Sequence, residues 1–543
     1  MSNSISRIPD PVNEPVRGYA PGTPERASLS KALLDIRADA ADIPIVIGGK
    51  EIRTGNTFPL VEPHDHQHVL GVYHAGDADT VSAAAAAAAA ASHDWATMDF
   101  DDRAAIFLRA ADLLAGPWRD RVNATTMLGQ SKTVLQAEID AACELIDFFR
   151  FNVSYARQLM EIQPGSQPGM WNRCEYRNLE GFVFAVTPFN FTSIAGNLPT
   201  APALMGNVCL WKPASTSVLS NWALMELLKE AGLPDGVINF VPGPGPAIGD
   251  PALAHPDLAG VHFTGSTSVF HGMWRTVGAN IANYRSYPRL VGETGGKDFL
   301  FAHPSADMDA VAIALLRGAF EYQGQKCSAA SRAYVPRSSW DTLREKLAHE
   351  VGKISMGNPL DFSHFMAAVI DQKSFDNCRN YIEGARSDSA CSILVGGDCD
   401  DSTGWFVQPT VIETADPKAT SMCEEIFGPI LTIYVYDDDK LDETLKLCDT
   451  TSPYALTGGI FARDRQVIAH MSSKLRHAAG NFYVNDKPTG AVVGQQPFGG
   501  GRASGTNDKA GSLLNLVRWS SVRTIKETFA PPVDWRYPHM GED

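Results

Sequence analysis

Three side chains that could act together on a carbonyl group stand in glycine- or proline-containing turns of this chain. Cys327 follows Gly324 and Lys326 at the end of an apolar run. A thiol at such a turn can be reached by a ligand, and we expect the Lys326 ammonium to favour the thiolate, the form that attacks carbon. Glu293 lies in Gly-Glu-Thr-Gly-Gly-Lys and Asn190 in Thr-Pro-Phe-Asn-Phe. A lone cysteine is more often structural, but these three residues together predict a nucleophile, a base and an oxyanion donor.

The segments that must position these residues alternate between strand and helix patterns. The strands are expected at 182–186, 208–211, 237–241 and 261–263, and the helices between and after them at 219–231, 246–254 and 267–279. After Glu293 a second section repeats the alternation, with strands at 299–302, 333–335, 393–395 and 431–434 and helices at 340–351 and 374–385. Such alternation predicts parallel sheets covered by helices.

The part of the chain before these sections is expected to be mostly helical. Residues 78–160 show apolar residues at three- and four-residue spacing, and the nine alanines at 83–91 can pack closely against a sheet. Residues 1–40 contain five prolines and are predicted to form an irregular arm over a neighbouring surface. A short hairpin is expected around Gly48 and Gly49.

The composition limits the classes of function. A chain of 543 residues is too long for one core, so two or three domains are expected. The formal net charge of −16 argues against nucleic acid and against an anionic membrane surface as partners. The alanine run is too short to span a bilayer, so we expect no membrane insertion.

The cysteines and the N-terminus bear on the compartment. Nine scattered cysteines without a C-x-x-C pair indicate free thiols in a reducing compartment and argue against a structural zinc. Residues 1–15 show no export or transit signal, which predicts a cytoplasmic protein. His64, His66 and His68 could share one strand face, but without a carboxylate or cysteine in ligand spacing we expect a solvated turn and no metal site.

Gly265-Ser266-Thr267-Ser268 follows a predicted strand and opens a helix. Free N–H groups and the helix dipole at such a point suit a diphosphate, although an ordinary N-cap would give the same pattern. The sequence contains neither a G-x-G-x-x-G fingerprint nor a Walker P-loop.

The three turns resemble the aldehyde dehydrogenase superfamily, in which the glutamate and the cysteine are separated as they are here (327 − 293 = 34). The runs 485–500 and 502–509 are similar to those of the Δ1-pyrroline-5-carboxylate dehydrogenases, also called glutamate-semialdehyde dehydrogenases. The resemblance extends from about Gly48 to Glu527. It implies an α/β, aldehyde dehydrogenase-like fold: a Rossmann-type NAD-binding domain with the N-terminal arm (1–162 and 180–291), an α/β catalytic domain (292–510) and a small β oligomerisation flap (163–179 and 511–543).

The resemblance also implies NAD as cofactor, bound through the Phe-Thr-Gly-Ser turn without a Rossmann fingerprint. The residues assigned to the cofactor are Thr187, Pro188, Lys212, Ser215, Gly265, Ser266, Glu425 and Phe427. Lys212 is expected at the adenosine ribose, Glu425 at the nicotinamide ribose and Phe427 against the ring. Many relatives have a glutamate that excludes a 2′-phosphate where this chain has Ser215, so use of NADP stays open.

By the same resemblance the substrate is L-glutamate γ-semialdehyde, the open form of Δ1-pyrroline-5-carboxylate, and the product is L-glutamate, in the second step of proline catabolism. The residues assigned to the substrate are Glu144, Phe189, Lys326, Ser328, Gly490, Ala491 and Phe498. Glu144 is expected to accept from the α-amino group, Ser328 and the backbone at 490–491 to hold the α-carboxylate, and Phe189 and Phe498 to bracket the methylene chain. A glycine-rich loop offering N–H groups suits a carboxylate.

The mechanism follows from what an aldehyde needs to become an acid. The Cys327 thiolate adds to the carbonyl, and the Asn190 amide with the Cys327 N–H stabilises the oxyanion of the thiohemiacetal, by on the order of 3 kcal/mol per donor. Hydride leaves to the nicotinamide, and Glu293 activates the water that hydrolyses the thioester.

Other interpretations remain. The substrate could be another ω-semialdehyde, such as succinic or aminoadipic semialdehyde, or the fold could serve as an inactive scaffold. Acyl transfer to coenzyme A needs no water-activating base, so Glu293 favours hydrolysis. The resemblance implies a homodimer or a higher homo-oligomer, in which 514–528 pairs with the arm near 165–180 of another subunit. No segment matches a proline dehydrogenase domain, so that activity would come from a separate partner.

Overall fold

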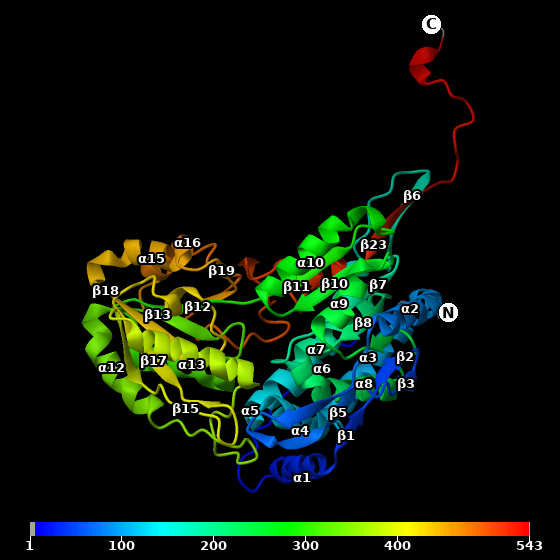
Figure 1. The fold of residues 1–543 in the computed structure, drawn as a ribbon. Helices are drawn as coiled ribbons and strands as arrows, with labels where there is room; N and C mark the ends of the chain where they lie inside the picture. The colour runs from blue at the N-terminus through cyan, green and yellow to red at the C-terminus, as the bar shows by residue number, and fades with distance from the viewer. Residues whose placement is uncertain (1–5, 542–543) are drawn as a thin grey trace.

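The computed structural model describes residues 6–541 and contains two α/β units, each built around a seven-stranded sheet (Figure 1). Residues 1–5 and 542–543, the outer ends of two predicted segments, lie outside the described residues. The strand and helix alternation predicted on either side of Glu293 is confirmed: the first unit holds the strands expected before it and the second unit those expected after it.

The first sheet has the order β11-β10-β7-β8-β9-β2-β3. Its parallel strands are β7 (Phe182–Val186), β8 (Val208–Lys212), β9 (Ile238–Phe240), β10 (Leu258–Thr264) and β11 (Arg289–Glu293), and the predicted hairpin β2 (Ile45–Ile47) and β3 (Lys50–Ile52) extends one edge. The inner strands read as continuous apolar runs, as expected for a sheet buried on both faces. Successive strands proceed to one side of β7 and then to the other, so the ends of β7 and β10 flank a topological switch point, where such sheets bind ligands.

Helices cover this sheet and form a layer beside it. The helices that follow the strands are α7 (Thr192–Leu204), α8 (Val218–Ala231), α9 (Gly245–Ala254) and α10 (Thr267–Ala279). The helical region predicted at 78–160 is confirmed as α2 (Ala78–Thr97), α3 (Phe100–Ala115), α4 (Arg119–Gln130), α5 (Val134–Ala137) and α6 (Glu144–Met160). The alanine run of α2 packs against β8, as expected. Between α5 and α6, residues Glu138–Cys143 form a π-helical segment, which the sequence pattern did not predict.

The second sheet has the order β14-β17-β18-β13-β12-β20-β21, and only β14 is antiparallel to its neighbour. The strands are β12 (Asp298–Ala302), β13 (Ala330–Pro336), β14 (Cys391–Val395), β17 (Thr410–Thr414), β18 (Ile430–Tyr436), β20 (Thr457–Phe461) and β21 (Asn481–Val484). The helices of this unit are α11 (Met308–Phe320), α12 (Arg337–Val351), α13 (Gln372–Ser387), α15 (Leu441–Thr450) and α16 (Arg465–Lys474). Shorter elements are β15 (Cys399–Asp400), β16 (Phe406–Val407), α14 (Thr420–Cys423), β19 (Tyr454–Ala455), β22 (Gly501–Arg502) and α17 (Leu513–Val517).

The N-terminal region is less irregular than predicted. Residues 6–22 have no helix or strand, but Pro24–Ala38 forms helix α1. Proline fits the first turn of a helix, and Leu29 and Leu33, one turn apart, bury the inner face. The prediction of an irregular segment up to residue 40 was therefore wrong, because the prolines stop where the helix begins.

The histidine segment belongs to a three-stranded sheet of β1 (Ala41–Ile43), β5 (Asp65–His74) and β4 (Thr57–Glu62). His64 is fully buried, with its Nε2 3.2 Å from Glu62 Oε2, so the predicted solvated turn was wrong at that residue. Within residues 6–541, no group of three or more His, Cys, Asp or Glu side chains has a geometry that could hold a metal ion.

The expected flap is a two-stranded ribbon, β6 (Met170–Arg177) with β23 (Ser521–Thr528), that projects from the first unit with the C-terminal tail beyond it (Figure 1). The two segments pair within one chain, which corrects the prediction that residues 514–528 pair with another subunit. Arg173 and Glu527 form an ion pair across the ribbon. No helix in the described part of the chain is long and apolar enough to cross a membrane.

Close contact between β12 and β20 leads to a stability prediction. Gly458 is paired with Phe299, and a Cβ at this glycine would lie 2.2 Å from the buried Phe299 ring. Overpacking of this kind costs about 1–3 kcal/mol, so Gly458→Ala is expected to lower the thermal unfolding midpoint by about 1–3 °C. Gly278→Ala, in α10 with no described atom within 4 Å of its Cβ, is the control and should not lower it. Equal midpoints for the two variants would contradict the prediction.

Candidate active site

Cys327 lies where two cavities meet. A larger cavity of about 640 Å³ extends along the carboxyl ends of β7, β8 and β10, and a smaller one of about 260 Å³ lies among α6, α7 and residues 489–493. Both are lined by Cys327. Glu293 lines the smaller cavity and Asn190 the larger, so the structure brings the three predicted residues together around this junction.

The thiol is positioned by a sharp reversal after α11. Tyr322 and Gln323 have positive φ values of 50° and 54°, followed by Gly324 at 66°, and the chain turns back towards β13. The two side chains in this strained conformation are fixed by burial: Tyr322 Oη donates to Gln130 O at 3.0 Å, and Gln323 Nε2 donates to Ser131 O at 3.0 Å. The reversal therefore depends on the helical layer of the first unit.

The charges around Cys327 differ from the expectation. Lys326 turns to other partners, because its Nζ lies 3.2 Å from Asp140 Oδ2 and hydrogen-bonds to Gln136. Burial, reinforced by the carboxylates of Asp298 and Glu293, raises the pKa of Cys327 well above its ordinary value. The prediction that Lys326 favours the thiolate was wrong, because Lys326 is paired with Asp140 and burial of the Cys327 thiol disfavours its charged form.

Glu293 ends β11 in a pocket that disfavours its charge. Burial raises the pKa of this carboxyl well above its ordinary value. Its Oε2 has no hydrogen-bond partner among residues 6–541, and a Cβ at Gly499 would lie 3.1 Å from its Oε1. The arrangement is that of a carboxyl group with one oxygen free to bind a water molecule or a proton.

Asn190 closes the loop after β7 and is fully enclosed. Its Nδ2 donates to Gln325 O at 2.9 Å, two residues before Cys327. The carboxamide therefore lies against the reversal that carries the thiol, in reach of a group bonded to the sulfur.

Gly295 and Gly296 are required because neighbouring groups lie too close to their Cα atoms to leave room for a side chain. Glu425 Oε1 accepts from the Gly296 N–H at 2.8 Å, and a Cβ at Gly295 would lie 2.1 Å from the other carboxylate oxygen. A Cβ at Gly296 would lie 2.3 Å from Cys327 O. Burial raises the pKa of Glu425 to about 7.

Seven of the eight residues predicted to bind the cofactor line the larger cavity: Thr187, Pro188, Lys212, Gly265, Ser266, Glu425 and Phe427. Ser215 does not. The chain turns into a 3-10 segment at Ser215–Ser217, so Ala214 lines the larger cavity while Ser215 lines a separate small cavity with Tyr73.

The larger cavity has the features of a site for an elongated, phosphorylated ligand. Three glycines in its wall, Gly245, Gly249 and Gly272, have no described atom within 4 Å of an ideal Cβ, so the space beside the backbone is open. The helices α9 and α10 begin at this cavity without a side chain bonded to their first N–H groups. Such helix ends attract phosphate oxygens.

The residues predicted to bind the substrate line the smaller cavity with one exception: Glu144, Lys326, Ser328, Gly490, Ala491 and Phe498 line it, whereas Phe189 does not. Phe189 lines the larger cavity, where its ring packs edge-on against Phe427 at 5.8 Å between centroids. The predicted bracket of Phe189 and Phe498 is therefore split between the two cavities.

The π-helical segment carries Asp140, which lines the smaller cavity together with Glu144 and belongs to a cluster of buried charged groups. Lys132 Nζ donates to Asp140 Oδ2 at 2.6 Å, and Ser193 Oγ donates to Glu144 Oε2 at 2.6 Å. Burial and the nearby Asp140 raise the pKa of Glu144 to about 8. The sequence pattern missed Asp140 and Lys132, because the extra residue per turn that directs Asp140 inwards leaves no mark on the periodicity.

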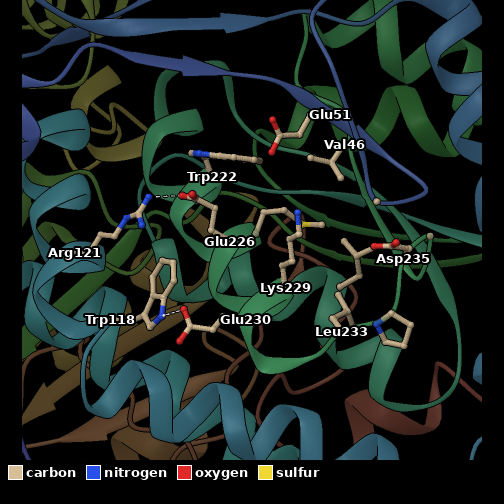
Figure 2. Close-up of a pocket in the computed structure, with 15 residues that line it drawn as sticks. Val46, Glu51, Trp118, Arg121, Trp222, Glu226, Lys229, Glu230, Leu233 and Asp235 are labelled. Atoms are coloured by element: carbon tan, nitrogen blue, oxygen red, sulfur yellow. Dashed lines mark hydrogen bonds and ion pairs between the residues drawn. The ribbon is translucent and has the colours of Figure 1, made fainter.

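A further cavity, of about 340 Å³, lies between α4, α8 and the β2–β3 edge and shares no lining residue with the two cavities at Cys327 (Figure 2). Arg121 pairs with Glu226 and stacks over Trp118, whose Nε1 donates to Glu230 at 2.9 Å. No cysteine, serine or threonine is among the residues that line it.

Comparison with known proteins agrees with this geometry. The sequence profile of the Aldehyde dehydrogenase family matches residues 51–525. The chain is 54% identical to the mitochondrial delta-1-pyrroline-5-carboxylate dehydrogenase of Dictyostelium discoideum, over 98% of this chain and 96% of that protein.

Two solved structures are also similar. The Mycobacterium tuberculosis Delta-pyrroline-5-carboxylate dehydrogenase bound with NAD superimposes with a TM-score of 0.96 and 55% identity, covering 100% of both chains. Proline utilization A (PutA) from Bdellovibrio bacteriovorus superimposes with a TM-score of 0.91 and 30% identity, over 98% of this chain and 55% of that one.

The buried setting of Cys327 leads to a prediction about its reactivity. Because its pKa is raised, the thiolate fraction of the ligand-free protein should rise about tenfold per pH unit above pH 7. Alkylation of Cys327 by iodoacetamide, followed by peptide mass spectrometry, should therefore accelerate steadily between pH 7 and 9. The Cys327→Ala protein measures the contribution of the other cysteines. A rate that is already constant from pH 7 upwards would show that the thiolate is preformed.

Proposed function

This chain belongs to the aldehyde dehydrogenase family, and from that premise we propose that it oxidises L-glutamate γ-semialdehyde to L-glutamate with NAD. The observation that carries the proposal is the junction at Cys327: a thiol, a free carboxyl and a carboxamide stand between a cavity for an elongated ligand and one lined by Glu144 and a glycine-containing loop. Relatives named delta-1-pyrroline-5-carboxylate dehydrogenase, over half identical along nearly the whole chain, support the choice of substrate.

The larger cavity fits NAD. Its open glycines and uncapped helix ends suit the diphosphate, Lys212 stands at the end of β8 for a ribose hydroxyl, and Glu425 stands next to Cys327 for the other ribose. When bound, the nicotinamide supplies the hydride acceptor. Ser215 lies outside this cavity and Ala214 lines it, so residues 214–215 offer no carboxylate against a 2′-phosphate.

The first task of the chain is to remove the proton of Cys327. Glu293, which lines the same cavity and carries an unpaired Oε2, is the proposed acceptor of the Sγ proton. The sulfur then bonds to the aldehyde carbon, and the Asn190 Nδ2–H, together with the Cys327 N–H, donates to the oxygen as its negative charge develops. Enclosure of Asn190 strengthens this interaction, because water does not screen it.

The second task is hydrolysis of the thioester, which the thiohemiacetal becomes when its hydride passes to the bound hydride acceptor. Glu293, after releasing the first proton to solvent, takes a proton from a water molecule, whose oxygen attacks the acyl carbon; the sulfur leaves and takes up that proton. The raised pKa of this carboxyl makes it a stronger base than an exposed glutamate once it is ionised. The carboxylate product leaves the site, and Cys327 is again a free thiol.

The smaller cavity is the proposed binding site for the α-amino and α-carboxylate groups of the substrate. Glu144, neutral in the ligand-free site at pH 7, would give up its proton to hold an α-ammonium group, an exchange that its pKa of about 8 permits. Ser328 and the N–H groups at Gly490 and Ala491 would hold the α-carboxylate. Phe498 supplies an apolar wall beside the methylene chain. The alternative, another ω-semialdehyde such as succinic or aminoadipic semialdehyde, gives no such use to Glu144 unless the substrate carries an amino group.

Assembly and compartment are also proposed. The projecting β6–β23 ribbon supports a role as oligomerisation flap (163–179 and 511–543) in a homodimer or larger oligomer. The two sheets support an NAD-binding domain (1–162 and 180–291) and a catalytic domain (292–510). The likeness to proline utilization A over about half of that chain supports a separate proline dehydrogenase as partner. All nine cysteines are free thiols, as a reducing compartment such as the cytoplasm requires; several relatives are named as mitochondrial.

The reaction and its nucleophile are tested together. The wild-type protein should form NADH from NAD and Δ1-pyrroline-5-carboxylate, and Cys327→Ala should lose at least about 10³-fold in kcat, because Cys327 is the one described thiol that lines both cavities. The absorbance of NADH gives the reaction rate. The same assay with NADP in place of NAD shows which of the two cofactors the protein uses faster. Wild-type protein that oxidises other aldehydes but not this substrate would refute the substrate assignment, and protein that oxidises none would refute the function.

The role of Glu144 separates the two substrate classes. Loss of a charge-assisted hydrogen bond costs about 1.5–3 kcal/mol, so Glu144→Gln should raise KM for Δ1-pyrroline-5-carboxylate by about ten- to a hundredfold. KM for succinic semialdehyde, which has no amino group, should change by less than about twofold. Equal increases for both aldehydes would show that Glu144 does not recognise the amino group.

A further inference from the structure

The N-terminal arm, residues 6–22, forms part of the wall of the smaller cavity. Although the arm has no helix or strand, its residues Asn13, Glu14 and Val16 line the cavity together with Glu144. A segment from the start of the chain thus reaches the site proposed for the substrate.

Buried polar groups fix this segment in place. The Glu14 carboxylate pairs with Arg119 and, at 2.8 Å, with Arg150. Farther along the arm, Tyr19 Oη donates to Glu138 Oε2 at 2.8 Å, and both residues are buried. Breaking such a buried network is costly, so the arm is a fixed part of the wall.

Both the nitrogen and the oxygen of the Asn13 side-chain amide form hydrogen bonds. Its Nδ2 donates to Asp147 Oδ2 on α6 and to Val493 O, both at 2.8 Å, and its Oδ1 accepts from Gln495 Nε2 at 2.9 Å. The Glu14 N–H donates to the other Asp147 oxygen at 2.7 Å. One side chain therefore ties helix α6 to the loop that carries Val493 and Gln495.

That loop, residues 489–496, has no regular secondary structure and needs other contacts to hold its shape. Its start is fixed at Thr489, whose Oγ1 lies 2.8 Å from Ser328 Oγ and whose carbonyl accepts from Lys487 Nζ at 3.0 Å. Its far half is tied to the rest of the chain by the bonds from Asn13. Gly490 and Ala491, which line the cavity, lie between these two attachments.

We propose that Asn13 is a positioning residue for substrate recognition: it holds the 489–496 loop against α6, so that the N–H groups at Gly490 and Ala491 stay directed at the substrate carboxylate. The inference rests on the proposed function and deepens it by giving the N-terminal arm a part in specificity. Asn13 acts through the loop, so its loss should weaken the binding of aldehydes that carry a carboxylate and spare the chemistry at Cys327.

The kinetic test compares two aldehydes. Asn13→Ala should raise KM for Δ1-pyrroline-5-carboxylate by about tenfold with kcat within about twofold, and should leave KM for propanal, which has no carboxylate, unchanged. Val12→Ala, which alters a 69% exposed side chain of the same arm, is the matched control and should behave as wild type. Equal effects on both aldehydes, or a fall in kcat alone, would overturn the proposal in favour of a purely structural role.

A double variant separates the effect on KM from an effect on stability. A measurement without substrate tests the position of the loop without relying on the reaction. Combining Asn13→Asp with Asp147→Asn restores the bond between arm and α6 but leaves no donor for Val493 O, so it should regain thermal stability while KM stays high. Hydrogen–deuterium exchange of residues 489–496 should be faster in Asn13→Ala than in wild type, and unchanged exchange would overturn the proposal. Wild-type protein inert towards Δ1-pyrroline-5-carboxylate would refute the proposed function, and the exchange result would still decide whether Asn13 positions the loop.

Discussion

The burial of the ionisable groups around Cys327 is the constraint on which the site depends. Burial raises the pKa of Glu144, Glu293 and Asp298, and it lowers the pKa of Lys297 to about 7. Charged groups in a poorly solvated pocket give up their charge unless a partner arrives. The ligand-free site is therefore rich in ionisable groups that are largely neutral. Arrival of a cationic ligand group reverses this balance, because each carboxyl can then ionise beside a positive charge.

This constraint explains why the site lies between two units. A carboxyl at the end of β11 and a thiol before β13 belong to different sheets, and neither sheet alone encloses them. The short segment 294–297 brings the sheets so close that glycines are required where Glu425 and the Cys327 carbonyl approach the backbone. Enclosure, and with it the shifts in pKa, is thus a product of the contact between the units.

Much of this arrangement could be predicted from the sequence. Continuous apolar strands separated by helices indicated both sheets, and Lys212, Gly265 and Glu293 lie at the carboxyl ends of parallel strands in the first of them. The periodicity could not reveal the π-helical segment or the turn that removes Ser215 from the larger cavity. The direction of the Lys326 side chain was also beyond the pattern, because it depends on Asp140, which lies nearly two hundred positions away in the chain.

The N-terminal arm could not be identified from the sequence as part of the site. Its residues are polar and proline-rich, a composition that says nothing about which surface they cover. Only the folded chain brings Asn13 to Asp147 and Val493, 134 and 480 positions away. Loops without regular structure hold their shape through such contacts, since they lack a ladder of backbone hydrogen bonds. Recognition of a small substrate in this chain therefore depends on side chains whose role is to hold backbone in place, and these are the residues that a motif cannot identify.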